Sequence, residues 1–306
     1  MRRAWHPDDG GSWTRQNGQV TASPPRPAST VVLVRPASPA FEVFLVRRHD
    51  NVAFMSGAHV FPGGGVDDAD RVADPRRCCD GVDAAVARMP GRTPADAVAF
   101  HVAAVRELFE EAAVLLAREA RDGTDCGTPL RVARSGQTLL EWRHDLLRHR
   151  VTIGELADRE GLRLALDALT LFAHWVTPEV ETRRFDTCFF LAVAPENQQA
   201  AHDERENTHG TWLTPEDAIA RCRRGDIALP PPTWTTLRAL SAFTRVEDAE
   251  AWAHTQRAPR VQPCVTERSD GTRIIMLPGD PGCPPVEGFE AEERRFVLEG
   301  GRWRVS

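Results

Sequence analysis

The chain has 306 residues, of which 42% are apolar, and a formal net charge of −6. This length allows one large domain or two small ones, and the apolar content is enough to build a core. The net negative charge argues against a protein that binds nucleic acid or an anionic membrane, because both ligands attract basic surfaces.

The cysteines and the N-terminal sequence indicate in which cellular compartment the protein is expected. The seven cysteines are odd in number and show no C-x-x-C spacing, so we expect free thiols in a reducing compartment rather than a disulfide scaffold or a zinc site. The opening residues lack the apolar stretch of a signal peptide, and no run approaches the ~18 apolar residues of a membrane span. A soluble cytoplasmic protein without a membrane partner is therefore predicted.

A polar tail and two strands are the first elements expected along the chain. Residues 1–28 are rich in Pro, Gly and Ser and predict a flexible tail. The β-branched runs at 29–34 and 41–46 predict neighbouring strands joined by a Pro-containing turn. Arg47 and Arg48 follow the second strand directly.

A glycine-rich turn, FPGGG at 61–65, comes next. Glycines let the backbone turn tightly and bring its carbonyls close to a ligand. The segment from about 70 to 94 is polar and punctuated by Pro and Gly, with a short helical patch at 82–88. We expect this segment to form a surface excursion near the entrance of a site, the alternative being a loop without a role.

A helix with a marked apolar stripe is expected to start at Pro94, with Thr93 as its N-cap. Glu107, Glu110 and Glu111 lie on the face opposite that stripe. Carboxylates so close together repel one another, and a divalent cation such as Mg²⁺, which prefers oxygen ligands, would offset that cost. The alternative is a solvated acidic face. The stripe consists of Val98, Val102, Val105, Phe109, Ala112 and Leu116.

The second half of the chain is predicted to be helical at first and β-rich at its end. A mostly helical region is expected over about 123–172, with helices at 138–148, 153–159 and 162–172. Further helices are expected at 215–223, 233–243 and 246–256, and β-strands in 257–306.

Between the two helical regions, the apolar run at 184–193 predicts a strand buried on both faces. Arg183 and Arg184 at its start are candidates for binding phosphate, because arginine binds phosphate oxygens in a bidentate way. The alternative is a surface ion pair with Asp186 or Glu181.

The glycine turn and the long helix together resemble the Nudix box, whose pattern is G-x5-E-x7-R-E-U-x-E-E-x-G-U with U aliphatic. Gly64 matches the first glycine of the pattern. The R-E-U-x-E-E part is matched by Arg106, Glu107, Glu110 and Glu111.

Three departures from the box stand out. Asp70 takes the place of the family's first Glu and keeps a carboxylate there. Ala113 takes the place of the family's Gly, and we expect it to favour the helix, since Ala is the better helix former. The insert at about 70–94 splits the box.

A split box resembles one branch of the Nudix hydrolases, which includes the mammalian peroxisomal coenzyme A diphosphatase and many bacterial relatives. The preceding residues FMSGAHVF match this branch, as do RRFDT, LPPP and LPGD further along the chain. Members that act on coenzyme A carry an additional motif before the FPGG turn, which Arg48 and Gly57 match and from which Ala53 departs.

The resemblance implies an α/β (α+β) Nudix fold, in which a mixed β-sheet is sandwiched between helices. The Nudix domain would span 29–256, with insertions at about 70–94 and 123–172, and the β-rich extension at 257–306 would pack on the same domain. The implied activity is metal-dependent hydrolysis of a diphosphate linkage in a CoA-like nucleotide, most simply coenzyme A or an acyl-CoA. No nucleic-acid partner is expected, and a homodimer is allowed.

The resemblance also implies roles for individual residues. The Gly64 carbonyl with Glu107, Glu110 and Glu111 would hold one to three Mg²⁺ or Mn²⁺ ions, and Arg106 would orient the glutamates. Either Glu107 or Glu206 would act as the base, with Asp203 and Glu204 competing for the role of Glu206. The residues expected to bind the phosphates of the substrate are Arg47, Arg48, Arg183 and Arg184.

Two other functions stay open at this point. The substrate could be another nucleotide, such as ADP-ribose, NADH or a capped RNA end. The fold could also bind a nucleotide without cleaving it, although such proteins normally lack the helix glutamates that this chain retains.

Overall fold

A computed structural model describes residues 23–49, 57–120, 135–198, 200 and 207–306 of the chain. Its centre is a mixed eight-stranded sheet in the order β10-β2-β1-β9-β8-β11, with β3 beside β2 and β4 beside β1. The strands β1 and β9 are parallel, whereas β1 and β2 are antiparallel. The strands are β1 (Arg26–Arg35), β2 (Glu42–Arg48), β3 (His59–Val60), β4 (Gly63–Gly65), β8 (Thr170–Val176), β9 (Phe185–Val193), β10 (Asn207–Leu213) and β11 (Arg260–Val261).

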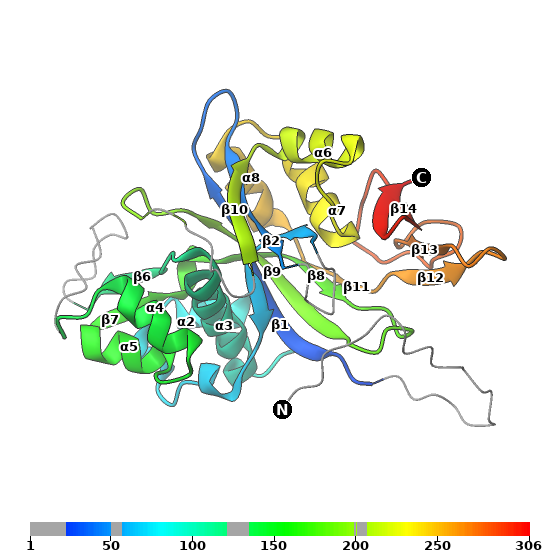
Figure 1. Ribbon diagram of the computed structural model, residues 1–306. Helices are drawn as coiled ribbons and strands as arrows, with labels where there is room; N and C mark the ends of the chain where they lie inside the picture. The colour runs from blue at the N-terminus through cyan, green and yellow to red at the C-terminus, as the bar shows by residue number, and fades with distance from the viewer. Residues whose placement is uncertain (1–22, 50–56, 121–134, 199, 201–206) are drawn as a thin grey trace.

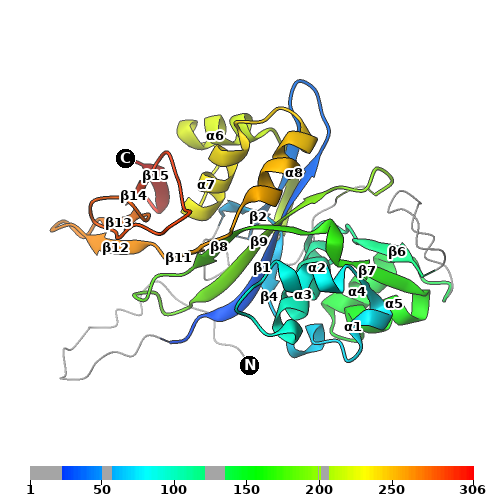
Figure 2. The same cartoon turned by 180° about the vertical axis from the view of Figure 1, so that it is seen from behind.

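Helices cover both faces of this sheet (Figures 1 and 2). Alternate residues of β1 enter two different cores, because successive side chains of a strand point to opposite faces. Val31 and Leu33 pack with α2–α5, and Val32 and Val34 pack with α6–α8. The prediction of a mixed sheet between helices is confirmed. The helices are α2 (Val82–Ala87), α3 (Pro94–Ala112), α4 (Leu139–Leu147), α5 (Ile153–Glu160), α6 (Pro215–Arg224), α7 (Pro231–Leu240) and α8 (Val246–Thr255).

The strands β1 and β2 pair at one end and are separated at the other. Their paired residues are Val34 with Val43 and Arg35 with Glu42. Further along, β3 takes the place beside β2, and β4 pairs with β1 at Ala28–Thr30. The chain from β3 to β4 therefore crosses from one strand to the other, and this crossing brings the glycines beside α3.

The segment from about 70 to 94 has regular structure and is anchored to the core through a few buried residues, while most of its other side chains are partly or fully exposed. It follows the 3-10 turn η1 (Asp68–Asp70) and contains α1 (Pro75–Cys78), β5 (Cys79–Asp80) and α2. Cys79 is 1% exposed and Ala85 is 2% exposed. The strand β5 joins β7 (Leu162–Ala165) and β6 (Ala117–Glu119) in a second sheet, which needs this segment as a partner.

Two other elements differ from the predictions. Residues 162–172 form β7, the 3-10 turn η2 (Leu166–Ala168) and the start of β8 rather than a helix. Buried leucines alternate with a half-buried Arg163 in β7, and so short an apolar run does not distinguish strand from helix by its spacing. The strand β1 also begins at Arg26, inside the stretch assigned to the N-terminal tail.

The C-terminal strands β12 (Cys264–Glu267), β13 (Arg273–Met276), β14 (Arg295–Glu299) and β15 (Arg302–Val305) form a third sheet. Ile275 and Phe296 pack in the same core as α7. A disulfide joins Cys264 to Cys283, with their Cα atoms 5.5 Å apart, so the expectation that every cysteine is free is wrong. The chain reversal after β13 brings the two together, which spacing alone did not reveal. Of the helices described, none is both long and apolar enough to cross a membrane.

Candidate active site

The helix α3 supports the candidate site, and its ends follow from local chemistry. The Thr93 hydroxyl accepts a hydrogen bond from the Asp96 amide, and Pro94 occupies the first turn, as predicted. Beyond the last residue of the helix, Ala113 has φ 57° and ψ 21°. The expectation that Ala113 favours the helix is therefore wrong: it is the left-handed C-cap, a position that glycine occupies without steric cost.

Arg106 and Asp70 meet in the protein interior, although the insert separates them in sequence. The Arg106 Nε donates to Asp70 Oδ1 at 2.8 Å, and Nη2 donates to Oδ2 at 2.9 Å. Asp70 is fully buried, and its Oδ2 also accepts a hydrogen bond from the Asp67 amide at 2.8 Å. The bidentate geometry fixes both side chains. No role for Asp70 was assigned from the sequence, although its position after Gly64 pointed to it.

The remaining N–H groups of Arg106 donate hydrogen bonds to the glycine strand and to two glutamates of α3. Nη2 donates to the Gly65 carbonyl at 2.7 Å, and Nη1 donates to Glu107 at 2.8 Å and to Glu110 at 3.2 Å. Burial opposes the charge of Arg106, but the Asp70 hydrogen bonds and the neighbouring carboxylates outweigh it, so the Arg106 pKa is raised. Arg106 therefore holds the helix glutamates and the glycine strand in one arrangement.

The glycines of β4 lie directly against two glutamates of α3. The Gly63 amide donates to Glu111 Oε2 at 2.9 Å. A Cβ atom at Gly64 would lie 2.4 Å from Glu107 Oε1, closer than any real Cβ contact. A side chain at Gly64 would push Glu107 away, so glycine is required for this approach.

Burial and mutual repulsion raise the proton affinity of these carboxylates. The pKa of Glu107 is raised to about 8, chiefly because the side chain is buried, and the charges of Glu111 and Glu110 add to the effect while Arg106 opposes it. Burial likewise raises the pKa of Glu110. The carboxylates of Asp70, Glu107 and Glu110 thus contact the guanidinium of Arg106, and Glu111 lies close enough to Glu107 to affect its pKa, so the cluster has more acidic side chains than basic ones.

The chemistry of this donor set fits a divalent cation. Carboxylate and carbonyl oxygens are the ligands that Mg²⁺ prefers, and the glycine strand packs directly against Glu107 and Glu111. Within the described ranges, however, no three His, Cys, Asp or Glu side chains are already arranged as a ligand group. Here Glu107 and Glu110 contact Arg106 instead, and Glu111 accepts from the Gly63 amide.

Arg143 of α4 is a neighbour of the site that sequence reasoning missed. Its Nε donates to the Glu110 carbonyl at 2.9 Å, and the residue is buried. The contact depends on how α4 packs against the end of α3, for which the sequence carries no signal.

Of the four arginines predicted to bind phosphate, two lie at the end of β2 and two at the start of β9. Arg47 and Arg48 end β2, and the Nε of Arg48 is buried without a hydrogen-bond partner among the described residues. Arg183 is exposed at the start of β9. The nitrogens of Arg184 donate to the carbonyls of Thr177 and Ser23 and to the side chain of Gln262, which gives Arg184 a structural role.

The partners suggested as an alternative for Arg183 and Arg184 have other contacts. Asp186 pairs with Arg92 at 2.8 Å and contacts His174 at 2.5 Å, and Glu181 pairs with Arg273. The candidates Asp203, Glu204 and Glu206 lie outside the described residues, as does Ala53.

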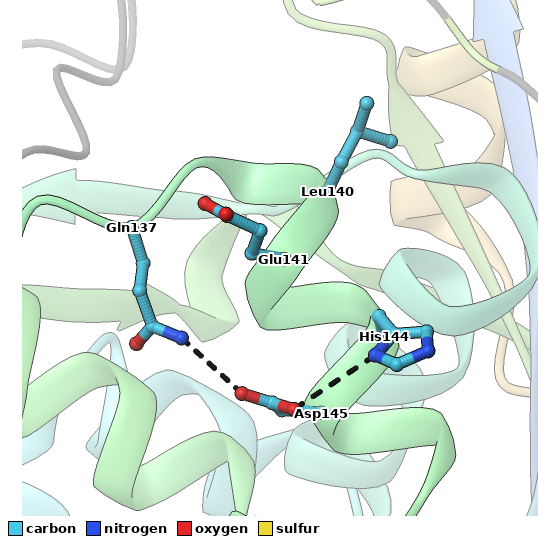
Figure 3. A pocket seen from close by; sticks show the side chains of 5 residues that line it. All are labelled: Gln137, Leu140, Glu141, His144 and Asp145. Atoms are coloured by element: carbon cyan, nitrogen blue, oxygen red, sulfur yellow. Dashed lines mark hydrogen bonds and ion pairs between the residues drawn. The ribbon is translucent and has the colours of Figure 1, made fainter.

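An open pocket of about 290 Å³ lies on α4 (Figure 3), and its lining includes no residue of the carboxylate cluster. Its polar side chains have local roles: Glu141 completes the N-terminal capping box of α4, and Asp145 accepts from Gln137 and Arg150. Leu140 points away from the other lining residues (Figure 3). None of the lining residues is a candidate ligand or base, so the candidate site is the cluster around Arg106.

A family model and several curated proteins similar to this chain carry the same family name. The family model described as the NUDT19 Nudix domain matches residues 84–240. The acyl-coenzyme A diphosphatase NUDT19 of Homo sapiens is 31% identical over 300 residues, covering 88% of this chain and 76% of that protein. The protein of the same name from Gallus gallus is 29% identical over 289 residues, covering 83% of this chain and 76% of that protein.

A solved structure is similar as well. The crystal structure of a Nudix hydrolase from Alicyclobacillus acidocaldarius matches with a TM-score of 0.59 and 27% sequence identity. The match covers 74% of this chain and 96% of the bacterial one.

Proposed function

The chain belongs to the NUDT19 Nudix domain family, and from that membership we propose that it is a hydrolase that cleaves the diphosphate linkage of coenzyme A or an acyl-CoA. The observation that carries this proposal is the arrangement of Glu107, Glu110 and Glu111 against the glycine strand, with Arg106 between them. Clustered carboxylates suit phosphate chemistry once a divalent cation is bound to them.

The residues that would hold a divalent cation, Mg²⁺ or Mn²⁺, are Glu107, Glu110, Glu111 and the Gly64 carbonyl. When bound, such a cation neutralises a diphosphate, polarises phosphorus and makes water a better nucleophile. The gathering of these carboxylates beside the single guanidinium of Arg106 supports this assignment. Activity measured with each metal in turn distinguishes Mg²⁺ from Mn²⁺.

The side chains of the site have separable tasks. Arg106 is hydrogen-bonded to Asp70, Glu107 and Glu110, so its task is to position the carboxylates rather than to bind substrate. Glu111 holds the glycine strand through the Gly63 amide. Glu107 lies among these carboxylates and would take the proton released by the attacking water. Glu206 is the alternative residue for the role of base.

The reaction adds one water across a phosphorus–oxygen–phosphorus linkage. The hydroxide part of water bonds to one phosphorus, the bridging oxygen leaves with the other, and the proton passes to the base. With coenzyme A, the products are 3′,5′-ADP and phosphopantetheine, and an acyl-CoA gives the acylated form of the latter. The support for this substrate is that the relatives of Homo sapiens and Gallus gallus are named acyl-coenzyme A diphosphatases.

A panel of diphosphates tests the proposal. Purified protein is incubated with coenzyme A, an acyl-CoA, ADP-ribose or NADH, each with Mg²⁺ or Mn²⁺, and the products are separated by chromatography. We expect the two CoA substrates to be hydrolysed with the highest kcat/KM. Faster hydrolysis of ADP-ribose or NADH would assign another substrate, and no hydrolysis of any would favour a nucleotide-binding role. A cytoplasmic location and a homodimer stay predictions.

A further inference from the structure

Four basic side chains, Arg47, His59, His209 and Arg221, gather on one side of the sheet, and we call them the basic face. Arg47 of β2 is directly opposite His59 of β3 on one side and His209 of β10 on the other. Directly opposite residues of antiparallel strands project to the same face of a sheet. Three adjacent strands therefore present a basic side chain at the same level.

The basic face lies on the side of the sheet that α6 covers. Leu45, two residues before Arg47, packs with Ala218 and Ile219 of α6 in the second core. The helix α6 contributes Arg221. The His59 amide donates to the Ala228 carbonyl at 2.8 Å, which ties β3 to the chain that follows α6.

The charges of the basic face repel one another. Burial, followed by the charges of Arg47, His209 and Arg221, lowers the pKa of His59 to about 4. The Nδ1 atom of His59 is buried and has no hydrogen-bond partner within the described part of the chain, and the same holds for the Nε of neighbouring Arg48. Arg221 also pairs with Asp217 at 3.0 Å. A buried polar atom without a partner is costly, so its persistence points to a ligand that supplies one.

The basic face is close to the carboxylate cluster along the chain but separate from it. His59 precedes Gly63, whose amide binds Glu111, by four residues, a span of at most about 13 Å in an extended strand. The glutamates approach the glycine strand from the α3 side, whereas the basic face lies on the α6 side. An anion held there is near the reacting diphosphate without occupying its place.

We propose that the basic face binds a phosphomonoester of the nucleotide substrate, distinct from the diphosphate that is hydrolysed. On a coenzyme A substrate this group is the 3′-phosphate, which ADP-ribose and NADH lack. The inference rests on the proposed function for the identity of the substrate. A dianionic phosphate accepts several hydrogen bonds and offsets the repulsion among the basic side chains.

Binding of nucleotides in EDTA tests this inference without any turnover. Isothermal titration calorimetry compares adenosine 3′,5′-bisphosphate with adenosine 5′-monophosphate, which differ by the 3′-phosphate alone. We expect the bisphosphate to bind at least ~10-fold more tightly. His59→Gln and Arg221→Gln should each shrink that ratio. The matched control is Arg224→Gln on the same helix, since Arg224 pairs with Asp226 and lies outside the basic face.

The outcomes separate this inference from the proposed function. Equal affinity for the two nucleotides in the unaltered protein overturns the inference, even if coenzyme A is hydrolysed. A ratio that falls as much in Arg224→Gln as in Arg221→Gln also overturns it, because the effect would then be general charge. A high ratio lost only in the basic-face variants supports it, even if the protein hydrolyses nothing. Arg221 is partly exposed, so its variant keeps the test valid if His59→Gln does not fold.

Discussion

Arg106 binds Asp70 through two hydrogen bonds of 2.8 and 2.9 Å, across an insert that contains a strand and two helices. The two halves of the split Nudix box are therefore in contact in the folded protein. The family places Glu where this chain has Asp70, and here the shorter carboxylate reaches the same arginine that orders Glu107 and Glu110. The insert begins at this ion pair, leads into α3, which carries Arg106, and is anchored to the core by Cys78, Cys79, Ala85 and Met89.

Breaking that ion pair should affect both stability and activity. Asp70→Asn leaves Arg106 buried with less compensation, so we expect a loss of about 3 kcal/mol in the free energy of unfolding. Activity should fall as well, because Arg106 would no longer hold the glutamates. Urea unfolding and kcat measurements check this, with Asp83→Asn as the control, since the Asp83 pair with Arg76 is exposed. Full stability and activity in Asp70→Asn would contradict the role given to the pair.

Glu111 should be needed for catalysis but not for folding. Glu111→Gln keeps the size of the side chain and an oxygen for the Gly63 amide, while it removes a charge that a cation would use. We expect kcat to fall at least ~10²-fold with little change in Tm. Glu141→Gln on α4 is the control and should retain activity. If Glu111→Gln is inactive only because it is unfolded, the assignment is wrong.

Removal of divalent cations should abolish activity. The cluster has more carboxylates than basic groups, and the proposed chemistry needs a cation to neutralise the diphosphate. EDTA should stop turnover, and added Mg²⁺ or Mn²⁺ should restore it. Undiminished turnover in EDTA would rule out the metal-dependent mechanism.

The pKa of Glu107 predicts how the stability of the cation-free protein depends on pH. Folding raises that pKa from 4.5 to about 8, so the folded state favours the protonated form. The resulting stabilisation is complete below pH ~4.5 and is lost as the pH rises towards ~8. In EDTA, the free energy of unfolding should fall over this range relative to Glu107→Gln, by at most ~1.4 kcal/mol per pH unit. Parallel pH profiles for the two proteins would contradict the shift.

Ala113 should be a site where glycine stabilises the protein. Its φ of 57° is costly for a residue with a Cβ atom, so Ala113→Gly should raise the free energy of unfolding by about 1 kcal/mol. The neighbouring Ala112 is the last residue of α3 and is fully buried, so Ala112→Gly should lower the free energy of unfolding by a similar amount. Urea unfolding of both variants gives the comparison, and a destabilised Ala113→Gly would show that the left-handed C-cap is not strained.

The helix and the glycine turn were predictable because local rules determine them. Thr93, Pro94 and the apolar spacing of α3 specify its start and its buried face without tertiary information. The resemblance to the Nudix box then indicated which carboxylates gather. The position of Ala113 was misjudged because helix propensity says nothing about where a helix ends.

The remaining errors concern contacts between distant segments. The insert looked like a loop because its composition is polar, but Cys78, Cys79, Ala85 and Met89 are buried and β5 pairs with β7. Cys264 and Cys283 are brought together by the C-terminal sheet. The basic face arises from the register of β2, β3 and β10, which no local pattern reveals.

Hydrolysis of coenzyme A in ¹⁸O-labelled water, with Mg²⁺ and then with Mn²⁺, is the most direct test of the proposed function. Mass spectrometry identifies both products and the phosphate that carries the label. We expect 3′,5′-ADP and phosphopantetheine, with one ¹⁸O in one of the two, and no products from Glu111→Gln under the same conditions. Coenzyme A that stays intact with both cations, in a protein shown to be folded, would contradict the account.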